Sequence, residues 1–263
     1  MKYILVTGAC GGMGRKTAEA LAEKGFTVFA LDRKTETAQK NIIPIQADIT
    51  NEESIRLAVQ RVGEITDTLF AIVHFAGVYM LDSLAEMGSE TFERIFRINV
   101  FGAFLINKAF LPFLKKGSRI LMTTSELAPL DPLPFTGIYA VTKSALDKYA
   151  YSLRMELQLL GIEVSVLRAG AVNTGMLGVS TQALDRFCEN TELYSCNAKR
   201  FKSIVESVEA RCIPPEKIAE KTKKILGKKH AKFAYAVNRN PLLLMLNCLP
   251  KRTQLWIIKK ILE

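Results

Sequence analysis

A tyrosine and a lysine in one predicted helix have the residue types and spacing for acid–base chemistry. Tyr139 and Lys143 are four positions apart, so a helix places them on one face, one turn from each other. Ser125 precedes Tyr139 by 14 residues and ends a predicted strand. The positive charge of an ammonium group favours the phenolate form of a nearby phenol, which helps the phenol to transfer a proton near neutral pH. A phenol and an ammonium placed in this way could transfer a proton, although the spacing alone is weak evidence, and Ser125 lies at the edge of the sheet where ligands bind.

A glycine-rich stretch near the N-terminus predicts a phosphate site. Residues 7–14 read T-G-A-C-G-G-M-G and fall between the first predicted strand and the first predicted helix. Glycine lets the backbone approach a ligand closely, and the free amides at a helix N-terminus favour a phosphate group. In this position the stretch predicts a site for the diphosphate of a dinucleotide.

A carboxylate at the end of the second predicted strand bears on the choice of dinucleotide. Asp32 follows Gly14 by 18 residues. A carboxylate there can accept hydrogen bonds from the adenosine ribose hydroxyls and repels a 2′-phosphate, which favours NAD over NADP. Arg33 follows directly and can bind a phosphate, so NADP stays open as the alternative cofactor.

The elements that must position these residues alternate between strand and helix along the chain. Strands are predicted at 3–6, 26–31, 42–47, 68–75, 119–124, 162–167 and 232–237, and helices at 15–24, 52–62, 90–114, 139–160 and 215–226. Strands this apolar need cover on both faces, which predicts a doubly wound, Rossmann-like α/β fold with a parallel sheet of about seven strands. Residues 175–212 show no strong period, and 240–263 predict two short helices split by Pro250. We expect one domain over 1–263.

Taken together and in order, these motifs resemble the short-chain dehydrogenase/reductase family in its short single-domain form. The resemblance runs from residue 1 to about 240. The glycine-rich stretch matches the family's T-G-x-x-x-G-x-G, and residues 168–174 are similar to its P-G-x-V-x-T on the nicotinamide side. Asp48 matches an adenine-contacting Asp and Asn99 an Asn within a helix. The extended sugar-nucleotide epimerases have a different glycine spacing and are disfavoured.

The resemblance implies an NAD(P)-dependent oxidoreductase that interconverts a secondary alcohol and a ketone by hydride transfer. It implies Asn99, Ser125, Tyr139 and Lys143 as catalytic residues, with Lys143 also holding the nicotinamide ribose and Asn99 positioning a water. The implied cofactor-binding residues are Gly8, Cys10, Gly12, Met13, Gly14, Asp32, Arg33, Asp48, Ile49, Ala76, Gly77, Tyr139, Lys143, Gly170, Val172 and Thr174. It further implies a homodimer or homotetramer, and no metal site is expected.

Three departures from the family pattern bear on the site. The family's N-N-A-G is H-F-A-G at 74–77, and we expect His74 to be structural. Ala169 stands in place of a proline and loosens one turn next to the nicotinamide. The interval from Ser125 to Tyr139 is one residue longer than is commonest, so Thr124 is the alternative hydroxyl. None of these changes removes a reacting group.

Composition limits the partners. The chain is 49% hydrophobic and 24% charged, with a net charge of +10. Residues 215–263 hold 12 Lys and Arg against 3 Glu (net +9), whereas the preceding 214 residues hold 24 against 23 (net +1). Nucleic acid is not predicted, because no zinc-finger, RNP-like or homeodomain-like motif accompanies the charge. Five cysteines, an odd number without a Cys-x-x-Cys pair, predict free thiols in the cytoplasm.

Two segments suggest the type of substrate and the location of the protein. Residues 171–212 are expected to close over the nicotinamide as a substrate lid, and their apolar residues suit a steroid- or retinoid-like substrate. These are Met176, Leu177, Val179, Leu184, Phe187, Leu193 and Tyr194. The extension 238–263 mixes apolar and basic residues as interfacial amphipathic helices do, which predicts peripheral membrane contact. The extension is equally suited to cover the substrate pocket or an oligomer interface.

Other functions stay open at this point. A 3-oxoacyl-carrier reductase would normally prefer NADP, which Asp32 opposes. A non-catalytic nucleotide-binding scaffold on the same fold has no need of the four proton-handling residues. A membrane-docking interaction protein explains the extension but leaves the site without a use. We expect no signal peptide, and the apolar run 242–246 is far shorter than the roughly 20 residues that span a bilayer.

Overall fold

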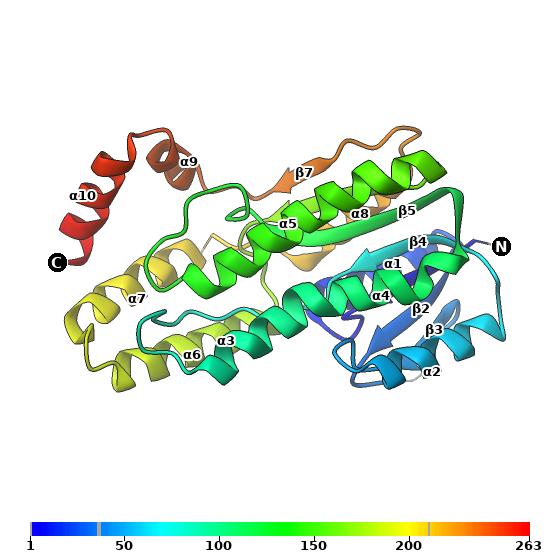
Figure 1. Cartoon of the computed structure of the whole chain (residues 1–263), viewed down its shortest axis with the longest axis horizontal. Coiled ribbons are helices and arrows are strands. Elements are labelled where there is room, and N and C mark those ends of the chain that lie inside the picture. The colour runs from blue at the N-terminus through cyan, green and yellow to red at the C-terminus, as the bar shows by residue number, and fades with distance from the viewer. Residues whose placement is uncertain (1, 36–37, 210) are drawn as a thin grey trace.

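The computed structural model describes residues 2–35, 38–209 and 211–263, apart from the side chains of 176–180, 208 and 209. Its centre is a sheet of seven parallel strands in the order β3-β2-β1-β4-β5-β6-β7 (Figure 1). The strands are β1 (Tyr3–Thr7), β2 (Thr27–Asp32), β3 (Ile42–Gln46), β4 (Leu69–His74), β5 (Leu114–Ser125), β6 (Glu163–Ala169) and β7 (Ala234–Val237).

Helices cover both faces of the sheet. They are α1 (Gly12–Glu23), α2 (Glu52–Gly63), α3 (Ser89–Phe96), α4 (Gly102–Phe110), α5 (Gly137–Leu157), α6 (Gly175–Asn190), α7 (Ser195–Glu209), α8 (Pro215–Leu226), α9 (Pro241–Asn247) and α10 (Lys251–Leu262). One apolar core joins α2, α4 and α5 to the sheet, and a second joins α1 and α8 to its other face. The predicted doubly wound α/β fold is therefore confirmed.

Strand order determines where a ligand can bind. The chain starts in β1 and proceeds outward to β2 and β3, then returns to β4 on the other side of β1. In such sheets, ligands bind beyond the carboxyl ends of the strands, next to the point where the order reverses. Here that point lies between β1 and β4, whose pairing ends at Thr7 and His74.

Two stretches differ from the expected elements. The stretch 175–209 contains α6 and α7, which the weak apolar period did not predict. The apolar residues of these helices do not form one continuous face. Some line the cavity, and others enter a third core where Leu184 and Phe187 meet Phe201, Leu81 and residues of α10. Strand β5 begins at residue 114 rather than 119, because the polar stretch 115–118 continues as an irregular extension beside a register shift in β4.

The helical stretch Ser89–Phe113 has the length and apolar composition of a membrane span, alone among the described residues. In this fold it lies along the sheet. Ile95, Ile106 and Phe110 are fully buried, the last two in the core shared with α2 and α5. One face of the stretch packs into the core while the other is exposed, and a π-helical turn at Arg97–Phe101 interrupts it next to the ligand edge.

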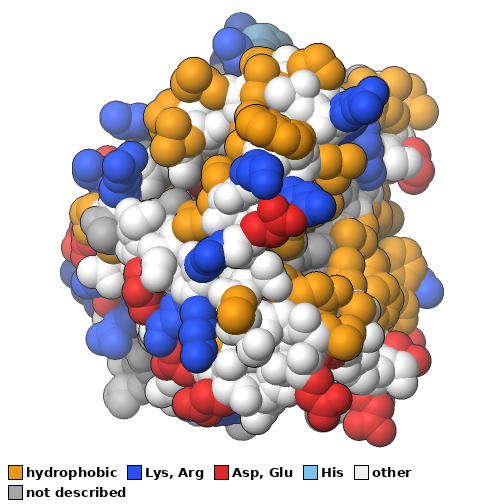
Figure 2. All heavy atoms as spheres, turned by 90° about the vertical axis from the view of Figure 1, so that its left-hand side faces the viewer, with side chains coloured by type: hydrophobic (Ala, Val, Ile, Leu, Met, Phe, Trp, Pro, Cys, Tyr) orange, Lys and Arg blue, Asp and Glu red, His pale blue; other side chains and the backbone are white. Residues whose placement is uncertain are grey.

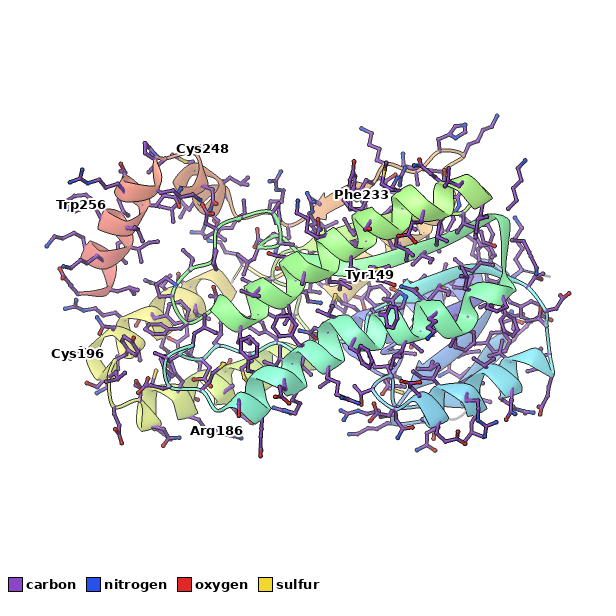
Figure 3. All side chains as sticks on the ribbon, in the orientation of Figure 1. Tyr149, Arg186, Cys196, Phe233, Cys248 and Trp256 are labelled. Carbon is purple, nitrogen blue, oxygen red and sulfur yellow. The ribbon has the colours of Figure 1, made fainter. Side chains whose placement is uncertain are left out.

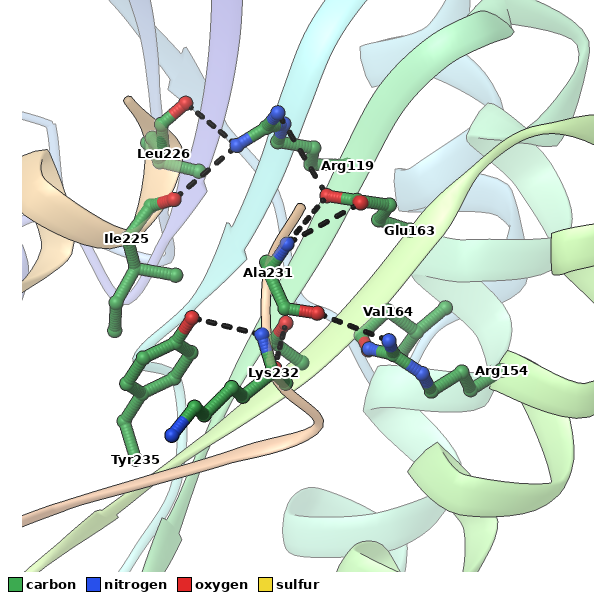
Figure 4. Close-up of polar contacts among 10 residues, drawn as sticks. Arg119, Arg154, Glu163, Val164, Ile225, Leu226, Ala231, Lys232 and Tyr235 are labelled. Carbon is green, nitrogen blue, oxygen red and sulfur yellow. Dashed lines mark hydrogen bonds and ion pairs between the residues drawn. The ribbon is translucent and has the colours of Figure 1, made fainter. Parts of the chain in front are cut away.

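A polar network fixes the last strand at the edge of the sheet (Figure 4). The guanidinium of Arg119 on β5 donates to the carbonyls of Ile225 (3.1 Å) and Leu226 (2.8 Å) at the end of α8, and pairs with Glu163. Glu163 accepts the amide of Ala231 at 3.2 Å, just before β7. The network holds β7 beside β6, so the chain leaves β7 at the ligand edge and continues there into α9.

Candidate active site

The glycine-rich turn packs so closely that side chains would not fit. Gly8 has a φ of +67°, and a Cβ there would lie 2.5 Å from the amide nitrogen of Ala76. A Cβ at Gly14 would lie 2.1 Å from the carbonyl oxygen of Gly8, and one at Gly12 would lie 2.8 Å from Cγ2 of Thr174. The turn leads directly into α1, whose first amides have no acceptor within the helix. This cradle fits a diphosphate.

Asp32 lies beside this turn at the end of β2. Its carboxylate accepts the amide of Cys10 at 3.0 Å and, more weakly, the amide of Lys34 at 3.3 Å. Arg33 is exposed next to it. Ionised carboxylate oxygens have several lone-pair sites, so Asp32 can accept further hydrogen bonds from a ribose.

Asp48 and Ile49 follow β3, on the β2 side of the sheet. Asp48 accepts the amide of Thr50 at 2.8 Å and its hydroxyl at 2.7 Å. Burial opposes ionisation, but these two bonds and the charge of Arg33 hold the pKa of Asp48 below its ordinary value. The side chain of Ile49 fills the space beside Gly102 of α4, where a Cβ would lie 2.6 Å from its Cδ1.

A cavity of about 620 Å³ opens beyond the carboxyl ends of β4, β5 and β6. Ser125, Tyr139 and Lys143 all line it. Other predicted site residues in its wall are Met13, Gly77, Gly170, Val172 and Thr174. The structure thus brings the predicted proton-handling side chains together with residues of the glycine-rich turn and of the stretch after β6.

Tyr139 lies in the first turn of α5. Burial raises the pKa of its phenol to about 12, and the charge of Glu126 acts in the same direction, while a hydrogen bond with Ser125 acts to lower it. The ring of Tyr79 meets that of Tyr139 edge-on at 4.6 Å. The alternative hydroxyl, that of Thr124, donates instead to Asp147 at 3.2 Å, so Ser125 is the hydroxyl directed at the phenol.

Lys143 lies one turn further along α5 and is buried, with 6% of its surface exposed. Its ammonium nitrogen donates to the carbonyl oxygen of Thr123 at 3.1 Å and lies 5.7 Å from the centre of the Tyr139 ring. Burial lowers the pKa of Lys143 to about 8. Part of the population is therefore neutral just above neutral pH.

Asn99 lies within the π-helical turn and does not line the cavity itself. Its Oδ1 accepts the amide of Val78 at 2.8 Å, and its Nδ2 donates to the carbonyl of Val78 (3.0 Å) and to the hydroxyl of Thr142 (3.1 Å). A Cβ on Gly77 would lie 3.1 Å from Oδ1 of Asn99 and 3.5 Å from Nζ of Lys143. Asn99 therefore holds the segment after β4 against Lys143. Turns of this π-helical kind are frequent at functional sites.

His74 ends β4 but is not part of the cavity lining. Its Nε2 shares a hydrogen bond of 2.9 Å with Oδ1 of Asn107 on α4, whose Nδ2 donates to the hydroxyl of Tyr149. Burial lowers the pKa of His74 to about 4, so the ring is neutral at pH 7. Figure 3 shows Tyr149 between α5 and α4. These hydrogen bonds tie α4 and α5 to the sheet, which is a structural role for His74.

The stretch after β6 forms the other wall. The amide of Gly170 donates to the carbonyl of Val237 at 2.9 Å, and a Cβ on Gly170 would lie 1.9 Å from the carbonyl oxygen of Asn238. Val172 pairs with Ile213, and Thr174, at the N-cap position of α6, packs against Gly12. With Ala169 ending β6 at the edge, the wall is fixed by β7 rather than by a proline.

The sequence analysis missed Glu126, which directly follows Ser125. It is 9% exposed, lines the cavity and accepts the amide of Asn240, ahead of α9, at 2.6 Å. Burial raises its pKa, although the bond from Asn240 and the charge of Arg239 oppose that shift. An acidic residue at the carboxyl end of a central strand is itself a sequence signal for a site.

The predicted lid segment 171–212 contributes to the cavity wall, but through other side chains than expected, and the C-terminal extension contributes as well. Leu184, Phe187, Leu193 and Tyr194 lie outside the cavity lining; Leu184 and Phe187 are buried in the third core, and Leu193 is exposed. Met176, Leu177 and Val179 have side chains outside the described part of the chain. Phe201, Ile204 and Val205 of α7 contribute to the lining, and so do nine apolar residues of the C-terminal extension. These are Leu242, Leu243, Met245, Leu246, Leu249, Ile257, Ile258, Ile261 and Leu262.

A doubly wound nucleotide-binding fold with a Ser, a Tyr and a Lys at its ligand edge defines a class of oxidoreductase-like proteins, and the comparisons identify the family. Residues 2–185 match the family model described as short chain dehydrogenase. The chain belongs to the short-chain dehydrogenase/reductase family, which confirms the resemblance found in the sequence.

Several relatives are named dehydrogenases or reductases. Mouse estradiol 17-beta-dehydrogenase 2 is 33% identical over 210 residues, which is 73% of this chain and 55% of that protein, so the chain spans about half of that relative. The 3-ketodihydrosphingosine reductase of Bacteroides thetaiotaomicron is 27% identical over 88% of this chain and 86% of its own. The solved short-chain dehydrogenase from Streptomyces avermitilis has the same fold, with a TM-score of 0.78, 22% identity and coverage of 99% and 96%.

Proposed function

We propose that this protein is an NAD-dependent oxidoreductase that interconverts a lipophilic secondary alcohol and its ketone by hydride transfer. One observation carries the proposal: Ser125, Tyr139 and Lys143 line the same cavity as Met13 of the glycine-rich turn. A site for a reacting oxygen and a cradle for a diphosphate therefore border one space. A scaffold that only bound a nucleotide would have no use for a buried phenol and a buried amine beside it.

The residues of the chain divide the proton chemistry between them. When bound, a nicotinamide cofactor supplies or accepts the hydride. During reduction, the protonated phenol of Tyr139 donates its proton to the substrate oxygen, while the hydroxyl of Ser125 orients that oxygen. In its ammonium form, Lys143 stabilises the phenolate that remains. Asn99 acts as a positioning residue, because it holds the Gly77–Val78 segment against Lys143.

Asp32 is the basis for proposing NAD over NADP. Replacing Asp32 with Asn is expected to lower the NADH-to-NADPH ratio of kcat/KM by about 10- to 100-fold, because it removes a charge-assisted hydrogen bond of about 1.5–3 kcal/mol. Asn keeps an oxygen that can accept the amide of Cys10, so the turn should be preserved. Steady-state kinetics with both cofactors measures the ratio.

The matched control for this change is Asp67→Asn, an exposed aspartate that precedes β4 at the opposite edge of the sheet. It removes the same charge from the protein without touching the turn, and we expect the cofactor ratio to stay within about twofold. If the two variants gave the same ratio, Asp32 would not be the selecting residue.

Apolar residues from α7, α9 and α10 in the cavity wall support a lipophilic substrate of steroid- or retinoid-like size. A volume of about 620 Å³ suits such a molecule. The names of the estradiol dehydrogenase and ketodihydrosphingosine reductase relatives point to the same substrate class. We infer that 171–212 and the extension 238–263 enclose the substrate together within one domain.

The proposal is tested by following NADH and NADPH oxidation with steroid ketones, retinal and acetoacetyl thioesters. We expect kcat/KM for a lipophilic ketone to exceed that for acetoacetyl thioesters by at least about tenfold, a difference of about 1.4 kcal/mol in transition-state binding. The reverse order would favour a 3-oxoacyl-carrier reductase. The proposed assembly, a homodimer or homotetramer, is measured by light scattering on the same preparation.

A further inference from the structure

The last helix of the chain has two apolar faces, and the body of the protein covers one of them. On the inner face, Gln254 is buried and donates to the carbonyl of Leu249 at 2.8 Å. At the end of the helix, Leu262 is buried against α6 and α7, and its carbonyl accepts the side-chain amide of Asn197 at 2.7 Å. The inner face thus fixes the position of α10, with Ile257 and Ile258 in the cavity wall.

The outer face of α10 is apolar, basic and exposed. Leu255 is 70% exposed and Trp256 62%, although burying them would be favourable. Arg252 lies one turn before them and Lys260 one turn after, both exposed, so cations flank the apolar pair at helical spacing. Figure 3 shows Trp256 on the side of α10 that faces away from the sheet.

Helix α9 continues this surface to the cavity. Leu242 is 62% exposed and Met245 68%, and both line the cavity as well. Side chains that are exposed and also line the cavity mark its opening, so the cavity opens at this surface. In the end-on view of Figure 2, orange apolar side chains lie beside blue Lys and Arg side chains on this end of the molecule. We call the set Leu242, Met245, Arg252, Leu255, Trp256 and Lys260 the C-terminal face.

Charge distinguishes between the partners that such a face can have. Residues 238–263 contain five Lys and Arg against Glu263, a net charge of +4. On the C-terminal face the cations are Arg252 and Lys260, and Lys260 pairs with Glu263 at 3.3 Å. A symmetric contact with a second copy would bring this basic face against itself, which is unfavourable. Anionic lipid headgroups complement the cations, and the acyl region accepts exposed leucine and tryptophan side chains.

We propose that the C-terminal face binds the surface of an anionic phospholipid bilayer, with the cavity mouth directed at the lipid. A lipophilic substrate can then pass between bilayer and cavity with little exposure to water. The surface binding is independent of the proposed enzymatic function, since it is measured without cofactor or substrate.

The test is co-sedimentation of the full chain with vesicles of phosphatidylcholine, with and without phosphatidylglycerol. We expect binding to the anionic vesicles that weakens as salt rises to about 0.5 M, where charges are screened within a few ångströms. Trp256→Glu and Leu255→Glu should each weaken binding at least about tenfold, and Arg252→Gln and Lys260→Gln about fivefold each.

Leu159→Glu is the matched control. This leucine is 83% exposed in the short turn Gln158–Leu160 at the opposite end of α5, so the same change there should leave vesicle binding within about twofold. Thermal unfolding of every variant checks that it folds. Equal binding to neutral and anionic vesicles, or binding that survives Trp256→Glu and Leu255→Glu, would overturn the proposal. The proposal would also be overturned if the protein did not bind vesicles and formed an oligomer that Trp256→Glu dissociates. A second copy of the chain would then cover the C-terminal face.

Discussion

Turnover should fall by at least about 10²–10⁴-fold when Tyr139 is replaced by Phe, while NADH binds nearly as tightly as before. The substitution keeps the ring, so its edge-on contact with Tyr79 at 4.6 Å remains, and it removes only the hydroxyl that is hydrogen-bonded to Ser125. Tyr79 also lines the cavity, but the substitution removes the phenol that is hydrogen-bonded to Ser125 and lies one turn from Lys143, and with it the group assigned to pass a proton to the substrate oxygen. Single-turnover kinetics gives the chemical rate, and fluorescence titration gives the affinity for NADH.

Tyr149→Phe provides the control on the same helix. The Tyr149 hydroxyl accepts a hydrogen bond from Asn107 at 3.2 Å and lies outside the cavity lining, so losing it should cost about 1 kcal/mol of stability and leave turnover within about twofold. A Tyr139→Phe enzyme that turns over at the wild-type rate would refute the assignment of the proton donor. So would a parallel loss of turnover in both variants, which would indicate damage to the helix rather than loss of a proton.

The sequence was most informative where local patterns and tertiary packing agree. Continuous apolar runs predicted every strand of the parallel sheet, and Pro215 with a periodic apolar face placed α8 at the observed residues. The two helices between 175 and 209 were missed, because their buried residues serve the third core and the cavity instead of one continuous face. The early start of β5 was missed because Gly117, with a φ of +93°, resembles a turn.

The site residues likewise differ in how far the sequence predicts their positions. Motifs placed the glycine-rich turn, Ser125, Tyr139 and Lys143, since each follows directly from a strand end or from helical spacing. The cavity roof is not predictable from local pattern, because Leu246 and Ile258 reach it only through the path that β7 gives the chain. From its sequence, the amphipathic extension could cover the cavity or contact a membrane. The structure makes both compatible, because α10 lines the cavity with Ile257 and Ile258 and exposes Leu255 and Trp256.

Removing the amine of Lys143 should make the protein more stable at pH 7 while it loses turnover by about 10² or more. Burial lowers the pKa of Lys143 from 10.5 to about 8, so between these values the unfolded chain binds more protons than the folded one. Stability of the wild type therefore rises with pH across that window. Below pH 8 the buried ammonium costs on the order of 3 kcal/mol, at about 1.4 kcal/mol per pKa unit.

Lys143→Met keeps the volume and flexibility of the chain and removes that cost, less about 1 kcal/mol for the lost hydrogen bond to Thr123. Its denaturation midpoint should exceed that of the wild type at pH 7, and the advantage should disappear as pH rises from about 8 to 10.5. Lys148→Met, at an exposed lysine of the same helix, should show no such pH dependence. A stability difference between Lys143→Met and wild type that is constant over pH would mean that the amine is not desolvated. The ammonium would then be charged at pH 7 without that stability cost, and the loss of turnover in Lys143→Met would remain as the test of its role beside the phenol.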